Sequence, residues 1–203
     1  MKVNGAYYVF EGVDGCGKST QADMLHRALN VDYHVAIRVN EPDEHNPVGR
    51  LLRQLLKSGE HKAAHAALFL ADRLVLQNET IAPALSINHT VISSRSFLST
   101  LVYQQENWDI SDLLVMHRIL PVKPDYLFVL DMDPEEALKR VDGRVGQREC
   151  YERLDIQKRN RQRYLDLMDD FRLHEMVSGT VTLIDGSGTP NEVHQRILEV
   201  ING

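Results

Sequence analysis

The segment that most constrains this chain is FEGVDGCGKST, at residues 10–20. It contains Gly12, Gly17, Lys18 and Ser19 in the spacing Gly-x4-Gly-Lys-Ser, which is typical of a phosphate-binding loop. The glycines allow a tight turn that directs backbone N–H groups toward phosphate oxygens. Lys18 supplies a positive charge for the β- and γ-phosphates, and Ser19 supplies a hydroxyl for Mg²⁺.

The flanking sequence favours this interpretation over a glycine-rich turn without a ligand. The apolar run at residues 6–10 predicts a buried strand, and Met24, Leu25, Ala28 and Leu29 follow the loop at helical spacing. The sequence therefore predicts that a nucleoside triphosphate binds between a strand and a helix. The residues expected to contact it are Gly12, Asp14, Gly15, Cys16, Gly17, Lys18, Ser19 and Thr20.

Length, charge and cysteine content narrow the class of protein. A chain of 203 residues, 43% hydrophobic and 26% charged, fits one domain spanning residues 1–203. The net charge of −6 argues against a general nucleic-acid binder, and no apolar stretch has the length of a membrane span. Two cysteines, Cys16 and Cys150, indicate neither a disulfide framework nor a zinc cluster, which favours a reducing, cytoplasmic location.

Strands and helices alternate along the chain, which predicts an α/β fold with a parallel sheet and right-handed crossovers. The expected strands are residues 6–10, Tyr33–Val39, Thr90–Ser93, Asp125–Asp131 and Val181–Asp185. Helices are expected after the loop, over 48–56, His61–Gln77, Glu79–Ile87, Ser96–Gln105, Ser111–Leu120 and Tyr151–Met176, and from Asp133 and Thr189 onward. Glycines interrupt the pattern at about 142–150, where we expect a short lid.

Four further segments follow the loop in a characteristic order. They are Asn40-Glu41-Pro42 with residues 48–53, then Phe69–Arg73, Ser93–Gln104, and the basic stretch 143–164. Together with the loop they resemble the thymidylate kinase family of P-loop nucleoside monophosphate kinases. The resemblance implies a three-layer P-loop NTPase fold with a five-stranded parallel sheet, and transfer of the γ-phosphate of ATP to dTMP with Mg²⁺ as cofactor. A guanine-reading Asn-Lys-x-Asp segment is absent from the sequence, which argues against a GTPase.

The resemblance also implies how the acceptor nucleotide is bound. Phe69 and Arg73 lie one helical turn apart, which suits a ring stacking on a planar base and a guanidinium donating to a base carbonyl. Arg53 and Arg95 match positions that hold the acceptor phosphate, and Asp14 matches a carboxylate that contacts the sugar 3′-hydroxyl. The remaining acceptor contacts implied are Thr100 and Gln104 on the pyrimidine edge and Tyr103 on the sugar.

Two positions depart from the family pattern in the acceptor half. Ser94 stands where the family has an Asp that organises Mg²⁺, and Asn40 stands where an arginine is usual. A serine hydroxyl is a weaker ligand for a hard cation than a carboxylate. The candidates to supply the missing charge through metal-bound water are Glu11, Asp14 and Asp131.

A third departure concerns the catalytic arginine. Some family members carry it inside the phosphate loop, at the position that Cys16 occupies here. The transition-state charge is therefore expected to come from the lid, from Arg148 or Arg144. With Lys18 and Arg95, these form the expected catalytic group.

Two other functions stay open at this point. One is a kinase of another deoxynucleotide or deoxynucleoside, and the other is a nucleotide-binding regulatory protein with weakened catalysis. The expected partners are ATP and dTMP, with no nucleic acid or membrane, and family members are commonly homodimers.

Overall fold

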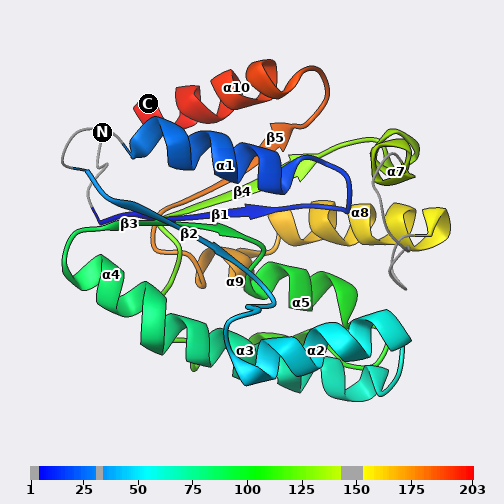
Figure 1. Ribbon diagram of the computed structural model, residues 1–203. Helices are drawn as coiled ribbons and strands as arrows, with labels where there is room; N and C mark the ends of the chain where they lie inside the picture. Colours follow the sequence, from blue (N-terminus) through cyan, green and yellow to red (C-terminus); the bar gives the residue numbers. More distant parts are fainter. Residues whose placement is uncertain (1–4, 31–33, 143–152) are drawn as a thin grey trace.

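The centre of the molecule is a five-stranded parallel sheet (Figure 1), in a computed structural model that describes residues 5–30, 34–142 and 153–203. The strands are β1 (Tyr7–Glu11), β2 (Ala36–Asn40), β3 (Thr90–Ser94), β4 (Tyr126–Asp131) and β5 (Thr180–Asp185). Their order is β2-β3-β1-β4-β5, so β1 lies in the middle with β3 and β4 as neighbours. The predicted α/β class with five parallel strands is confirmed.

Helices cover both faces of the sheet, which gives three layers (Figure 1). One face carries α1 (Lys18–Leu29) and α10 (Pro190–Asn202), and the other carries α3 (His65–Leu76), α4 (Ala82–Ser86) and α5 (Phe97–Tyr103). Outside α3 lies α2 (Pro47–Ser58). The remaining α-helices of the described residues are α6 (Ile110–His117), α7 (Pro134–Asp142), α8 (Leu154–Met168) and α9 (Phe171–His174).

The central strand is buried on both sides, as its apolar sequence predicts. Residues 7–10 are all 0% exposed because helices lie above and below them. Tyr8 stacks on Tyr126 with ring centroids 4.8 Å apart, and Phe10 packs against Phe128 at 5.3 Å. This packing fixes the carboxyl end of β1 and therefore the start of the phosphate loop.

The second strand begins later than the sequence predicts. β2 starts at Ala36 because its partner β3 starts at Thr90, and these two residues are paired in the register. The backbone N–H of Thr90 also donates to the carbonyl of Val35 at 2.9 Å. Tyr33, where the strand was expected to begin, lies outside the described residues.

α3 and α4 form one continuous helical path where the sequence predicts two helices, His61–Gln77 and Glu79–Ile87. A short 3₁₀ turn, η1 (Lys62–Ala64), leads into α3, and a π-helical turn, η2 (Gln77–Ile81), joins α3 to α4. Within this turn the side chain of Gln77 pairs with the backbone of Val122, donating at 3.2 Å and accepting at 3.1 Å. The π-helical turn thus places the buried side-chain amide of Gln77 where both its donor and its acceptor are hydrogen-bonded.

The helix predicted over Tyr151–Met176 is shorter and divided. α8 ends at Met168 and α9 begins at Phe171, because the carboxylate of Asp170 caps the second helix by accepting from Arg172 N at 2.9 Å. Its expected start, and residues 143–150 of the lid expected at about 142–150, lie outside the described residues, whereas Asp142 is the last residue of α7.

Substitution of Gly15 tests how closely the phosphate loop packs against α7. A Cβ atom on Gly15 would lie 2.0 Å from the carbonyl oxygen of Ala137, whereas one on Gly17 would have no neighbour within 4 Å. Both residues have a positive φ, so alanine at either position costs about 1–3 kcal/mol in backbone strain. We expect Gly15→Ala to lower the free energy of unfolding, measured by urea titration, clearly more than Gly17→Ala. Equal losses would contradict the close contact.

Candidate active site

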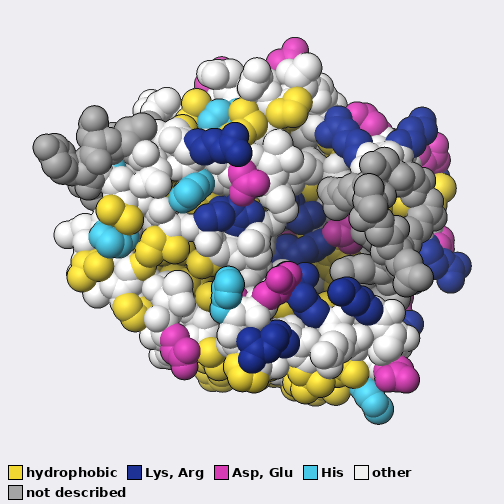
Figure 2. Space-filling model, in the orientation of Figure 1, with side chains coloured by type: hydrophobic (Ala, Val, Ile, Leu, Met, Phe, Trp, Pro, Cys, Tyr) yellow, Lys and Arg dark blue, Asp and Glu magenta, His cyan; other side chains and the backbone are white. Residues whose placement is uncertain are grey.

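The expected site residues converge at the carboxyl edge of the sheet, where parallel folds place their ligands. The backbone N–H of Arg95 donates to Phe10 O at 2.9 Å, and that of Glu41 donates to Ser94 O at 3.2 Å, so the ends of β1, β2 and β3 meet there. A cavity of about 270 Å³ opens at this edge. Figure 2 shows Lys and Arg side chains gathered around a hollow between α1 and α2. The predicted residues that line the cavity are Asp14, Gly15, Gly17, Lys18, Ser19, Thr20, Arg53, Phe69, Arg73, Arg95, Tyr103 and Gln104.

The phosphate loop has its lysine folded inward. Lys18 Nζ donates to the carbonyl oxygens of Gly12 at 2.9 Å and Val13 at 2.7 Å. Burial, and then the positive charge of Arg95, lowers the pKa of Lys18 below its ordinary value. An anion in the loop would oppose both effects, so the lysine is poised to exchange two carbonyl oxygens for phosphate oxygens.

A second hollow of about 390 Å³ lies on the other side of the loop. Gly12 and Cys16 are the two predicted loop residues that do not line the first cavity. Cys16 lines this second one together with Gly186, Gly188 and Arg140. Sequence reasoning did not assign the segment after β5 or Arg140 to the site. The two glycines that follow a strand at the carboxyl edge were the available signal.

Asp14 and Arg95 join the loop to the opposite wall. Arg95 Nη2 forms an ion pair with Asp14 Oδ1, and Arg95 Nη1 donates to Ser99 Oγ at 2.9 Å. The guanidinium also lies over the ring of Tyr103, 5.1 Å from its centroid. The hydroxyl of Tyr103 donates to Asp14 Oδ2 at 3.3 Å, and burial followed by the charge of Asp14 raises the pKa of Tyr103, which keeps it a neutral donor.

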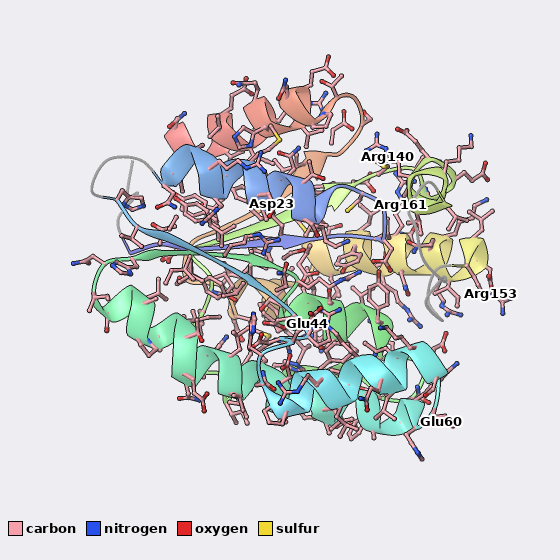
Figure 3. The ribbon with its side chains drawn as sticks, in the orientation of Figure 1. Asp23, Glu44, Glu60, Arg140, Arg153 and Arg161 are labelled. Atoms are coloured by element: carbon pink, nitrogen blue, oxygen red, sulfur yellow. The ribbon has the colours of Figure 1, made fainter. Side chains whose placement is uncertain are left out.

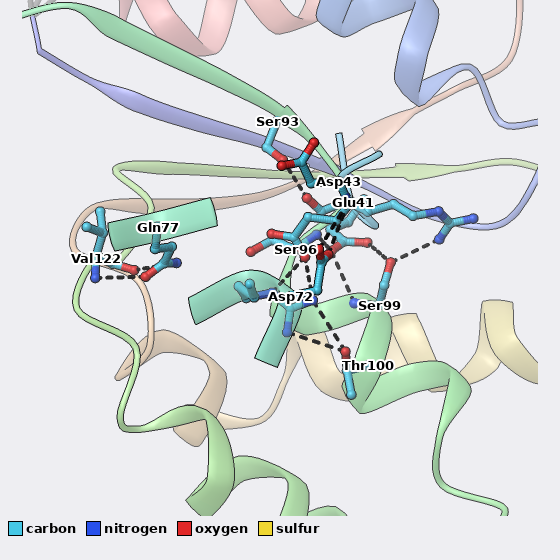
Figure 4. Close-up of polar contacts among 12 residues, drawn as sticks. Glu41, Asp43, Asp72, Gln77, Ser93, Ser96, Ser99, Thr100 and Val122 are labelled. Carbon is cyan, nitrogen blue, oxygen red and sulfur yellow. Dashed lines mark hydrogen bonds and ion pairs between the residues drawn. The ribbon is translucent and has the colours of Figure 1, made fainter. Parts of the chain in front are cut away.

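A buried carboxylate, which the sequence suggested only as a source of negative charge near Mg²⁺, organises this wall from behind. Glu11 Oε1 accepts from the backbone N–H groups of Ser96 at 2.6 Å and Ser99 at 3.1 Å. Its other oxygen, Oε2, accepts from the hydroxyls of Ser99 at 2.6 Å and Tyr164 at 3.0 Å. Four donors from α5, its N-terminal connection and α8 thus converge on the end of β1. Ser96 and Ser99, which supply three of them, are labelled in Figure 4.

The far wall carries the residues expected to recognise a base. Phe69, Arg73 and Gln104 line the cavity, as predicted. Thr100 does not line it, but lies behind Arg73, with its hydroxyl 3.4 Å from both terminal nitrogens of the guanidinium. Arg73 is fully buried and pairs with Glu41, which the sequence analysis quoted only as part of a motif.

Arg53 reaches the cavity from α2. Its Nη2 donates to Pro42 O at 2.9 Å, and its Nε lies 3.1 Å from Glu44 Oε1. Glu44, labelled in Figure 3, lies in the segment before α2 and is largely exposed. Asn40 lines the same cavity, so the position where the family has arginine faces the same space.

Comparisons with known proteins identify the family. The thymidylate kinase model matches residues 10–197. The chain belongs to the thymidylate kinase family. It is therefore a phosphotransferase.

Individual relatives cover nearly the whole chain. A probable thymidylate kinase of Thermococcus gammatolerans is 31% identical over 208 residues, covering 97% of this chain and 96% of that protein. A thymidylate kinase of Ruegeria pomeroyi is 32% identical over 210 residues, covering 99% and 96% respectively. The solved structure of thymidylate kinase from Candida albicans matches with a TM-score of 0.80 and 27% identity, over 98% of this chain and 92% of that one. The predicted P-loop NTPase fold is confirmed.

The candidate metal site of this thymidylate kinase family member has a neutral serine where the resemblance implies a carboxylate. Ser94 Oγ lies 3.3 Å from Ser19 Oγ, so the family's Asp position is next to the hydroxyl expected to bind Mg²⁺. The candidate replacements are engaged elsewhere: Glu11 in the network above, Asp14 with Arg95, and Asp131 with Arg161 through two contacts of 2.6 and 2.8 Å.

These contacts still fit a magnesium ion held largely by its substrate. Mg²⁺ binds one or two protein oxygens and completes its shell with phosphate oxygens and water. Within residues 5–30, 34–142 and 153–203, no group of three or more His, Cys, Asp or Glu side chains is arranged to hold a metal. Ser19 is thus the residue that fits the ion, with Ser94 beside it.

The two lid arginines, Arg144 and Arg148, lie outside the described residues. Two described arginines, Arg140 on α7 and Arg161 on α8, are labelled in Figure 3. Arg161 is held by Asp131, and Arg140 lines the second hollow.

Replacing Glu11 with Gln tests the buried network. The amide nitrogen would face hydrogen-bond donors where the carboxylate accepts four, so Glu11→Gln should lower the free energy of unfolding by about 1.5–3 kcal/mol. Tyr164→Phe removes one donor and leaves the carboxylate, so it should cost about 1 kcal/mol. Denaturant titration of both variants makes the comparison. An unchanged stability in Glu11→Gln would show that the network does not hold the site.

Proposed function

We propose that the protein transfers the γ-phosphate of ATP to dTMP, giving ADP and dTDP. The observation that carries this proposal is one continuous cavity whose near wall is the phosphate loop and whose far wall is formed by Phe69, Arg73 and Gln104. The ion pair between Asp14 and Arg95 lies between these walls.

The donor nucleotide occupies the loop. Its phosphates accept from the backbone N–H groups at the N-terminus of α1 and from Lys18, which leaves the carbonyl oxygens of Gly12 and Val13. The adenosine lies toward the second hollow, beside Arg140. Ser19 would hold Mg²⁺, which would supply charge neutralisation at the phosphates.

The acceptor lies across the cavity. Phe69 stacks on the pyrimidine, and Arg73 and Gln104 hydrogen-bond its edge. Thr100 supports Arg73 from behind, since its hydroxyl contacts the guanidinium. The other acceptor contacts are Arg53 and Arg95 on the phosphate, Asp14 on the sugar 3′-hydroxyl and Tyr103 on the sugar.

Catalysis follows from positioning and charge. An oxygen of the acceptor phosphate is already a competent nucleophile, so no side chain needs to remove a proton. Lys18 and Arg95 hold the two nucleotides in line, and Arg144 and Arg148 of the lid neutralise charge on the migrating phosphoryl group.

We further propose a single domain that works as a cytoplasmic homodimer without nucleic acid. The acidic net charge of −6 supports the last point. Among the described helices, none has the length and apolar character to cross a membrane.

A panel of acceptors tests the reaction. ADP release with ATP and Mg²⁺ should be rapid with dTMP and slow with UMP, CMP and thymidine. Arg73 suits a 4-carbonyl, which CMP lacks, Tyr103 packs where a ribose 2′-hydroxyl would lie, and thymidine has no phosphate for Arg53 and Arg95. Preference for another deoxynucleotide or a deoxynucleoside would favour that kinase instead. ATP binding without acceptor-dependent ADP release would favour a regulatory protein.

Ser94→Asp tests the altered metal site. The added carboxylate beside Ser19 should lower the Mg²⁺ concentration for half-maximal rate by about three- to tenfold, because a charged oxygen is a stronger ligand. Ser94→Asn, of similar shape but neutral, should leave it unchanged. A titration of rate against Mg²⁺ at saturating nucleotides measures both. Identical curves for the aspartate and asparagine variants would contradict a role of this position at the metal.

A further inference from the structure

Glu41 forms the most deeply buried ion pair of the candidate site. Its Oε2 accepts from Arg73 Nε at 2.7 Å and lies 2.5 Å from Arg73 Nη2 (Figure 4). Both side chains are 1% exposed. Burying two charges is favourable only when their geometry is held closely, so this contact constrains both partners.

The two partners come from different parts of the fold. Glu41 follows β2 directly, and its backbone N–H donates to Ser94 O at 3.2 Å, which anchors it to the edge of the sheet. Arg73 projects from α3, and its side chain has several rotatable bonds. The guanidinium also contacts Thr100, through a neutral hydroxyl at 3.4 Å. The carboxylate, carried on a backbone that is anchored to the sheet, is therefore the charged contact that orients the guanidinium.

The guanidinium has five N–H donors in one plane, and fixing Nε and Nη2 fixes the direction of the others. Glu41 and Arg73 both line the cavity. We propose that Glu41 is a positioning residue that holds Arg73 as the hydrogen-bond donor to the 4-carbonyl of the pyrimidine, and thereby sets the preference for a 4-oxo over a 4-amino base. This inference rests on the proposed function, since it takes dTMP as the acceptor.

The pair also makes base binding sensitive to pH. Burial raises the pKa of Glu41 to about 7, against the opposing charge of Arg73. The other groups that act on Glu41 are Asp72 on α3 and Glu11 on β1, both of which raise its pKa further. Among the described residues its second oxygen, Oε1, has no hydrogen-bond partner, so Arg73 is its main stabilising contact.

The remaining titratable neighbours stay neutral near pH 7. Burial, and then the charge of Glu41, raises the pKa of Tyr7 on β1 above its ordinary value. Burial, and then Arg73, lowers the pKa of His117 on α6 to about 3. Above about pH 7 Glu41 is ionised and holds Arg73. As the pH falls through this value Glu41 takes up a proton, Arg73 loses its charged partner, and the KM for dTMP should rise.

Glu41→Gln tests the proposal in the full-length enzyme. The neutral amide cannot hold the guanidinium by charge, so the KM for dTMP should rise about tenfold, while kcat and the KM for ATP change by less than about twofold. The ratio of kcat/KM for dTMP to that for dCMP should fall. The part of the rise in KM below about pH 7 that comes from Glu41 should be absent from this variant. The titration of the dTMP phosphate affects both enzymes equally, so it cancels when their KM values are compared at each pH.

Two further variants complete the experiment. Glu60→Gln makes the same chemical change at an exposed residue (Figure 3) and should behave as the wild type. Glu41→Asp keeps the charge on a shorter side chain, so it should restore the pH dependence with an intermediate KM. If thermal denaturation shows that Glu41→Gln does not fold, the comparison of Glu41→Asp with the wild type replaces it as the test.

The outcomes are distinct. The proposal is overturned if the wild type is active and Glu41→Gln keeps its KM for dTMP, its base preference and its pH profile. It is also overturned if the KM values for ATP and dTMP rise together with no change in base preference, because that result indicates a purely structural role. If the wild type itself does not phosphorylate dTMP, the proposed function fails, and this inference fails with it.

Discussion

The buried carboxylate of Glu11 is the contact on which the rest of the site depends. It lies at the end of the most buried strand and accepts from Ser96, Ser99 and Tyr164, which come from two other elements. These bonds hold the segment that follows β3, where Arg95 adopts a left-handed backbone with φ of 73°. That conformation is unfavourable for a residue with a side chain, so surrounding contacts must stabilise it. The network of Glu11 supplies such contacts within one residue of Arg95.

Positive and negative side chains alternate across the cavity. Lys18 on the loop and Arg95 on the opposite wall are separated by Asp14, which pairs with Arg95 and lies 4.0 Å from Lys18. Each cation thus has a protein partner until phosphate replaces it. The buried pair of Glu41 and Arg73 repeats this principle at the base end. In the proposed function, phosphate binding replaces the protein contacts of Lys18 and Arg95 with contacts to the nucleotides, while the pair of Glu41 and Arg73 persists. This arrangement limits the cost of burying isolated charges.

The sequence was sufficient for features that depend on neighbouring residues in the chain. The phosphate loop, the five strands and the capping box of Thr189 and Glu192 were predicted because their signals are local. The roles of Glu11 and Glu41 were not, since their partners lie up to 153 and 32 residues away. The start of β2 was missed for the same reason, because pairing with β3 sets it. The sequence identified Ser94 only as a departure from the family's Asp. The structure adds that Glu11, Asp14 and Asp131 are already paired with other protein groups.

The central claim is that donor and acceptor occupy two ends of one cavity, with Asp14 and Arg95 between them. A reagent in which a chain of phosphates joins adenosine to thymidine tests this most directly. Isothermal titration calorimetry should show one molecule bound per chain, more tightly than ATP or dTMP alone, and saturating concentrations of either nucleotide should weaken its binding. Binding no tighter than that of ATP, and insensitive to dTMP, would contradict a shared cavity.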